Sequence, residues 1–399
     1  LKTIQTLDEL DVSKPCIDVQ DEGYNVEWSQ ELKVFESFDE YLRAWVLVHA
    51  LQRALGFPGE RPGALFNMSV GYDLAGIQKP NVGWYLDTMA DASAYLPDYV
   101  VIVAARFPEV RDLEIPSRIS DTITLSTMHG CPPEEIEQIS LYLLEERGLH
   151  TSVKCNPTLL GAEGVRGIVN DELGYRDVPI PDEAFGHDLK YAEAVPMFHN
   201  LQRVATDRGL QFGLKLSNTL EVENWRTVFD ADAMMYMSGR ALHPVTVNLA
   251  ERLSEEFKGE LMLSFAGGAD AFNVSELLAA GMSTVTVCSD LLKTGGYLRM
   301  AQYTEHLAAD MEAVGAADLD GFVVRTAAAA GREADAQDSL TRVRDCARAN
   351  LRAYAAATRS DRRYRKDTYR SDRSKTGRQL GLFDCIEAPC VDECPVDQK

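Results

Sequence analysis

Glycines follow two short apolar stretches in a pattern that suits the binding of a phosphate group. Residues 237–244 read MSGRALHP, and residues 263–268 read LSFAGG. A glycine lets a backbone N–H group approach an anion without a Cβ atom in the way, and a following helix adds the positive potential of its N-terminal end. If the two turns end neighbouring strands, Gly239 and Gly268 together form a cup for one phosphate.

Three cysteines, Cys385, Cys390 and Cys394, lie close together near the end of the sequence, whereas the other five are scattered. Thiolates are soft ligands for iron and zinc, so this cluster indicates metal binding before it indicates disulfides. Three thiolates cannot complete a four-thiolate cluster, so a 4Fe-4S centre needs further ligands beyond Lys399. A zinc knuckle or unmetallated thiols remain the alternative.

A possible catalytic turn reads MHGCPP over residues 128–133. Cys131 could donate a proton, and His129 could act as an acid or a base. Proline at the first helical position, with glutamate behind it, is equally an ordinary helix start without a catalytic role. Another histidine, His243, follows the first glycine turn, and we expect it to pack beside Pro244 rather than to act in catalysis.

Short apolar runs alternate with amphipathic segments along the chain, and this βα rhythm is typical of a parallel sheet. Strand ends are predicted at Ile4 and within 65–70, 123–126, 152–155, 212–216, 235–237, 261–266 and 284–287. Helices are predicted at 39–55, 84–95, 133–147, 188–207, 246–257, 273–280 and 339–357. Eight strand signals predict an α/β fold, a TIM (β/α)8 barrel of the dihydroorotate dehydrogenase type.

Size and charge narrow the possible functions. The 399 residues are 45% hydrophobic and 26% charged, which is typical of a globular protein, and the net charge of −22 argues against a nucleic-acid partner. We find no apolar run long enough for a membrane span and no export signal, and expect a cytoplasmic protein. The basic run at 359–378 is expected to be a solvated linker, with a nucleic-acid- or phosphate-binding strip as the alternative.

Several motifs occur in one fixed order along nearly the whole sequence. They are LKT at 1–3, KPCID at 14–18, FNMSVGY at 66–72, STMHGCPP at 126–133, KCNPTLLG at 154–161 and KLSNTL at 215–220. Together they resemble the large subunit of the selenate reductase family, a multidomain iron-sulfur flavoprotein. The glycine turns and the VTVCS strand also resemble the flavin mononucleotide (FMN) barrels of dihydroorotate and dihydropyrimidine dehydrogenases.

This resemblance implies an FMN site at the strand ends, with the phosphate in the glycine turns and the lysines near the flavin ring. It assigns cofactor contacts to Lys2, Thr3, Lys154, Asn218, Ser238, Gly239, Gly267, Gly268, Cys288 and Ser289. The alternative for the two lysines is an ordinary position at a strand end. The resemblance also implies a 4Fe-4S cluster domain that begins near residue 380, and FAD and NAD(P)H sites in domains outside this chain.

The sequence departs from the dehydrogenase pattern at the catalytic centre. Met128 replaces the asparagine of N-x-S-C-P, the mobile acid loop is missing, and Asp73 stands where those enzymes carry a substrate asparagine. We expect the barrel portion of an NAD(P)H-linked iron-sulfur flavoprotein oxidoreductase that passes electrons to a small molecule or a partner protein. The alternative is a flavin-less scaffold that docks a molybdenum hydroxylase-type partner.

The domain organisation expected from these motifs has three parts. Residues 1–325 are predicted to form the FMN-type barrel, 326–379 a helical and basic linker, and 380–399 the start of the cluster domain. Related barrels begin with a strand upstream of the segment that matches LKT. We therefore expect the first strand to be missing and the sequence to be a fragment of a multidomain enzyme.

Overall fold

The computed structural model describes residues 17–18, 23–26, 33–59, 61–71, 73–126, 131–225, 229, 233–293, 295–334 and 338–366. These residues divide into two compact units, of which the first comprises residues 29–154 and 192–212. The second contains residues 13–28, 155–191 and the chain from Gly213 onward.

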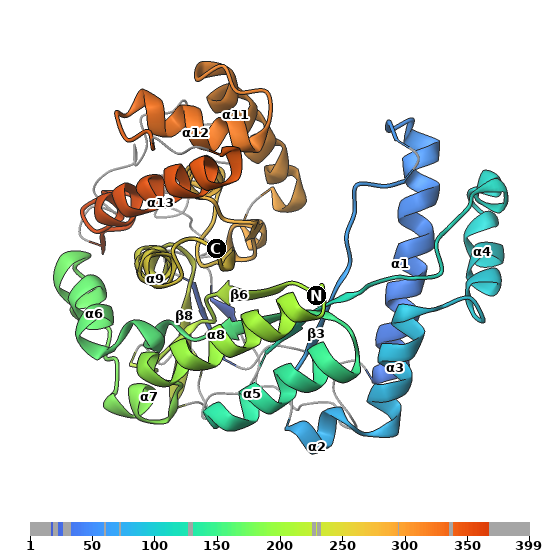
Figure 1. Ribbon diagram of the computed structural model, residues 1–399, viewed down its shortest axis with the longest axis horizontal. Helices are drawn as coiled ribbons and strands as arrows, with labels where there is room; N and C mark the ends of the chain where they lie inside the picture. Colours follow the sequence, from blue (N-terminus) through green and yellow to red (C-terminus); the bar gives the residue numbers. More distant parts are fainter. Residues whose placement is uncertain are drawn as a thin grey trace, which may run out of the picture. The chain divides into compact units, whose positions relative to one another are not determined.

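Three parallel strands and their helices form the first unit (Figure 1). The strands are β3 (Asn67–Val70), β4 (Thr122–Leu125) and β5 (His150–Cys155). The helices are α1 (Val34–Leu55), α2 (Leu74–Ile77), α3 (Pro80–Ala90), α4 (Leu96–Ala104), α5 (Pro133–Leu141) and α8 (Tyr191–Asp207). Apolar side chains such as Met68, Ile123 and Val153 are buried, because both faces of a parallel sheet are covered.

Among the described residues, the second unit contains parallel and antiparallel strands. The parallel strands are β6 (Phe212–Leu216), β9 (Met262–Ala266) and β10 (Thr284–Thr286). The antiparallel strands, in spatial order, are β1 (Ile17–Asp18), β2 (Gly23–Asn25), β8 (Met234–Ser238) and β7 (Leu220–Glu223). The helices are α6 (Ala162–Arg166), α7 (Asp182–His187), α9 (His243–Glu256), α10 (Val274–Ala279), α11 (Met300–Ala313), α12 (Leu319–Ala329) and α13 (Ser339–Thr358).

Parallel neighbours follow the order of the chain, as in a TIM barrel. In the first unit β3 pairs with β4 and β4 with β5; in the second β6 pairs with β9, with Lys215 opposite Ser264, and β9 with β10. The predicted strands at 65–70, 123–126, 152–155, 212–216, 261–266 and 284–287 are therefore confirmed. The predicted strand at Ile4 lies outside the described residues.

The assignment of residues 235–237 to a barrel strand is wrong. This segment belongs to β8, which pairs antiparallel with β7 and β2, so that Leu220 and Tyr24 both lie opposite Met237. Met235 and Met237 are buried, and buried side chains give the same sequence signal in a parallel and an antiparallel strand. The first glycine turn therefore follows the antiparallel strand β8, which lies with β7 between β6 and β9 in the sequence.

The C-terminal helices pack onto the second unit. Helix α13 lies beside α9 and α12 at the orange-to-red end of the colour scale (Figure 1). Beyond α13 the chain does not behave as the predicted solvated linker, because Tyr364 is buried in the core among Met237, Leu242 and Val245. The prediction is wrong for this part of the basic run, and residues 367–378 lie outside the described residues.

A candidate anion-binding site at two glycine turns

The two glycine turns of the second unit are in direct contact. Gly239 and Gly268 have φ angles of 68° and 67°, a left-handed conformation that glycine adopts without strain. A Cβ atom added to Gly268 would lie 2.2 Å from the Gly239 carbonyl oxygen. The predicted adjacency of the turns is therefore confirmed, and the contact is too close for any side chain at position 268.

Serine hydroxyls and a third glycine surround this contact. Ser238 Oγ lies 3.5 Å from Ser289 Oγ, which follows β10. Gly23 lies opposite Ser238 in the β2–β8 pair, and a Cβ atom at Gly23 would lie 2.5 Å from Ser238 Oγ. The sequence analysis missed Gly23, because only the long-range pairing of β2 with β8 brings it to the turns. Cys288, also predicted at this place, is exposed.

A buried ion pair anchors the loop that carries Ser289. Asp290 accepts hydrogen bonds from Arg299 Nε at 3.0 Å and Nη2 at 2.9 Å, and from the Tyr303 hydroxyl at 2.8 Å. Both charged side chains are about 6% exposed, and this bidentate geometry satisfies the two carboxylate oxygens. By contrast Tyr297 and Leu298, at the tip of the same loop, are 82% and 71% exposed.

Two further charged groups lie close to this anchor. Burial and the neighbouring Asp290 carboxylate raise the pKa of Asp270 to about 6. Burial lowers the pKa of Lys293, although Asp290 and Asp270 oppose this effect. The Arg240 and Arg299 guanidiniums also lower the pKa of Lys293, so basic and acidic side chains lie together near the turns.

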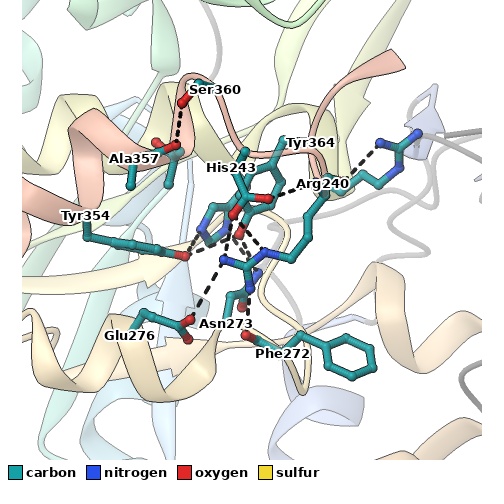
Figure 2. Close-up of polar contacts among 12 residues, drawn as sticks. Arg240, His243, Phe272, Asn273, Glu276, Tyr354, Ala357, Ser360 and Tyr364 are labelled. Atoms are coloured by element: carbon teal, nitrogen blue, oxygen red, sulfur yellow. Dashed lines mark hydrogen bonds and ion pairs between the residues drawn. The ribbon is translucent and has the colours of Figure 1, made fainter. Parts of the chain in front are cut away.

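His243 lies beneath both turns in a network of buried polar groups (Figure 2). Its Nδ1 atom is 3.0 Å from the Gly267 carbonyl oxygen, and its Nε2 atom is 2.7 Å from the Tyr354 hydroxyl. Burial, and to a lesser extent the Arg363 guanidinium, lowers the pKa of His243 to about 3, so the ring is neutral. The expectation that His243 packs in the core is confirmed.

The residues predicted to contact a flavin ring are only partly described. Asn218 follows β6. Its Nδ2 atom donates to Asn156 Oδ1 at 3.0 Å, and its backbone N–H donates to the Cys155 carbonyl oxygen at 2.7 Å. Lys154 is half-buried on β5 in the first unit, while Lys2 and Thr3 lie outside the described residues. Sequence reasoning missed Lys215, a half-buried lysine on β6 whose pKa is lowered by burial.

Cys131 precedes α5 in the first unit. Burial and the carboxylates of Glu135 and Asp73 raise its pKa to about 11, so that its thiol keeps its proton near neutral pH. Asp73 caps α2 by accepting a hydrogen bond from Gly76 N at 2.7 Å. His129 lies outside the described residues, so its role as an acid or a base stays a prediction.

The predicted metal ligands Cys385, Cys390 and Cys394 also lie outside the described residues. Within the described ranges, no group of three or more His, Cys, Asp or Glu side chains is placed to hold a metal ion. Within the same ranges, no helix combines the length and apolar character that crossing a membrane requires.

Comparison with known proteins gives the family. Residues 1–339 match the family described as "Oxidoreductase YgfK, N-terminal TIM-barrel domain". Two curated proteins named "Putative oxidoreductase YgfK", from Escherichia coli K12 and O157:H7, are 37% identical over 418 residues. These alignments cover 100% of the chain but 38% of each relative's length.

Solved structures of DHODH from Eimeria tenella, one ligand-free and one in complex with ferulenol, are 13% identical and have TM-scores of 0.47 and 0.48. Each comparison covers 79% of this chain, and 78% and 75% of the respective DHODH chains. The family match extends over most of the sequence. The chain therefore belongs to the YgfK oxidoreductase family and contains its N-terminal TIM-barrel domain.

Proposed function

We propose that this chain is the FMN-binding barrel portion of an iron-sulfur flavoprotein oxidoreductase, similar to the selenate reductase large subunit. The observation that carries the proposal is the contact between Gly239 and Gly268, flanked by the Ser238 and Ser289 hydroxyls. Glycine turns can present backbone N–H groups to a phosphate monoester, and two turns in contact would bring such groups to one place.

The residues present suit the phosphate of FMN. The Ser238 and Ser289 hydroxyls can donate to phosphate oxygens, and the Arg240 guanidinium adds positive potential. FMN, when bound, supplies transfer of one or two electrons. In this proposal Asn218 and the lysines at 2 and 154 contact the ring, and positive charge beside it favours the reduced, anionic form.

In the complete protein we propose that NAD(P)H reduces an FAD domain outside this chain and that 4Fe-4S clusters carry electrons to or from the barrel. Cys385, Cys390 and Cys394 are then ligands of the first cluster, completed by cysteines beyond Lys399. The acceptor is a small molecule or a partner protein.

The proposal is tested on the full-length protein by releasing its flavin with acid and identifying FMN by chromatography. Ser238→Trp places a bulky side chain where the Ser238 and Ser289 hydroxyls would meet the phosphate, so we expect loss of FMN with unchanged elution volume in gel filtration. Ser93→Trp is the matched control, because Ser93 is exposed on the first unit. Wild-type protein without FMN, after reconstitution with the free cofactor, would contradict the proposal.

One observation favours the second candidate, a flavin-less scaffold for a molybdenum hydroxylase-type partner. The Cys131 thiol has a pKa of about 11 and is a weak acid at neutral pH. A proton donor matched to neutral pH needs a lower pKa. This candidate predicts that Ser238→Trp leaves both partner copurification and enzyme activity unchanged.

A further inference from the structure

The hydrogen bonds beneath the glycine turns form one directed chain (Figure 2). The Gly267 carbonyl can only accept, so His243 donates from Nδ1, and its Nε2 accepts from the Tyr354 hydroxyl at 2.7 Å. Tyr354 then accepts from the Tyr364 hydroxyl at 3.2 Å. Tyr364 in turn accepts from Asn273 Nδ2 at 3.3 Å.

Asn273 closes this chain on the same turn. Its second Nδ2 hydrogen is donated to the Gly268 carbonyl at 3.0 Å, and its Oδ1 accepts from Asp270 N at 2.9 Å. The carbonyls of Gly267 and Gly268 are thus held by opposite ends of one network. Asn273 Nδ2 also lies 3.5 Å from His243 Nδ1, so the two ends of the network approach each other. Apart from this long contact, each donor of the chain has one acceptor, which favours a single arrangement of the protons.

Fixed carbonyls imply fixed N–H groups. In a trans peptide the N–H of the next residue points opposite to the carbonyl. Since the Gly267 and Gly268 carbonyls point into the buried network, the N–H groups of Gly268 and Ala269 point to the other side of the turn. The network thereby orients the donors that an anion would use.

The chain beyond α13 supplies the essential part of this network. The Tyr364 ring stacks on His243, with centroids 4.7 Å apart and planes 9° from parallel. The backbone carbonyl of Arg363 accepts from Arg240 Nη1 at 3.2 Å, and Arg363 Nη1 donates to the Phe272 carbonyl at 2.7 Å. Residues 361–366 therefore contact both glycine turns, through Arg240 on one side and Asn273 on the other.

We propose that residues 361–366 position the two glycine turns for anion binding, and that Tyr364 couples occupancy of the turns to docking of this segment. The identity of the anion, the phosphate of FMN, rests on the function proposed above. Coupling of this kind is reciprocal, so the anion stabilises the docked segment to the extent that the segment stabilises the bound anion.

The first test uses hydrogen exchange of the ligand-free full-length protein, followed by mass spectrometry. Tyr364→Phe keeps the stacked ring but removes the hydroxyl. In peptides covering residues 266–270 we expect the Asp270 amide, which donates to Asn273 Oδ1, to exchange about tenfold faster. Tyr354→Phe should act in the same direction while leaving Tyr364 in place. Tyr85→Phe is the matched control, since Tyr85 is buried on α3 in the first unit and contacts neither turn.

The second test measures binding of FMN and of inorganic phosphate alone. We expect Tyr364→Phe to weaken FMN about tenfold, equivalent to about 1.4 kcal/mol, and FMN to slow exchange of residues 361–366 in the wild type. Wild-type exchange at 266–270 in Tyr364→Phe, or undiminished FMN affinity, would overturn the inference. If the wild type bound neither ligand, the proposed function and the coupling to an anion would both fall, and the ligand-free exchange would still show whether Tyr364 orders the turn.

Discussion

Replacing Gly268 with alanine tests the contact between the two turns directly. Alanine at φ 67° carries left-handed strain of about 1–2 kcal/mol. Its Cβ would also lie 2.2 Å from the Gly239 carbonyl oxygen and 2.6 Å from the carbonyl carbon, so backbone must move, at a further cost of about 1–3 kcal/mol. We expect Gly268→Ala to lower the free energy of unfolding of the second unit by about 2–5 kcal/mol in total.

Gly331→Ala separates the two contributions. Gly331 belongs to the same unit and has φ 65°, but nothing lies within 4 Å of an added Cβ, so this variant shows the strain alone. Both variants are compared by urea unfolding, and Gly268→Ala should be the less stable by about 1–3 kcal/mol. FMN binding should be lost in Gly268→Ala and retained in Gly331→Ala. Equal stability of the two variants would refute the close packing of the turns.

Three further predictions concern the same unit and the candidate catalytic cysteine. Gly23→Ala should destabilise the chain by about 1 kcal/mol, because its Cβ crowds Ser238 Oγ at 2.5 Å. A double-mutant cycle with Ser238→Ala should recover most of that loss, and strict additivity would contradict the contact. The folded-state pKa of His243 is lowered to about 3, so protonation of this residue reduces the free energy of unfolding as the pH falls below about 6.5. The folded-state pKa of Asp270 is raised to about 6, so protonation of this residue increases the free energy of unfolding as the pH falls from about 6 to 4. Asp270→Asn should therefore steepen the acid loss of thermal stability over that range, and an unchanged pH profile would count against the raised pKa. Alkylation of Cys131 by iodoacetamide, followed by mass spectrometry, should rise about tenfold per pH unit from pH 7 to 10, and a plateau below pH 9 would contradict the pKa of about 11.

Local patterns in the sequence predicted the glycine turns and most strands well. Gly239 and Gly268 each follow a short apolar run, and both the left-handed turn and the strand before it are properties of neighbouring residues. Sequence reasoning placed the two turns together because both end βα units. The structure brings them into contact, although β8 reaches that place through antiparallel pairing.

Long-range pairing could not be predicted. Gly23 reaches Ser238 only through the β2–β8 register, and nothing near Gly23 in the sequence indicates a partner more than 200 residues away. Tyr364 lies in a run of arginines and lysines, where the charge pattern indicates solvent. An aromatic residue inside that run was the available signal, but its burial depends on a cavity formed by distant elements.

The loop after β10 combines a buried ion pair with exposed side chains. Asp290 and Arg299 hold its base by a buried bidentate pair, while the tip at Tyr297 and Leu298 is turned to solvent. We therefore expect substitutions at Tyr297 and Leu298 to leave Ser289 in place, because their side chains are exposed and the ion pair holds the base of the loop. The exposed part of the loop can therefore change its surface chemistry by single substitutions while the buried Asp290–Arg299 pair keeps its geometry.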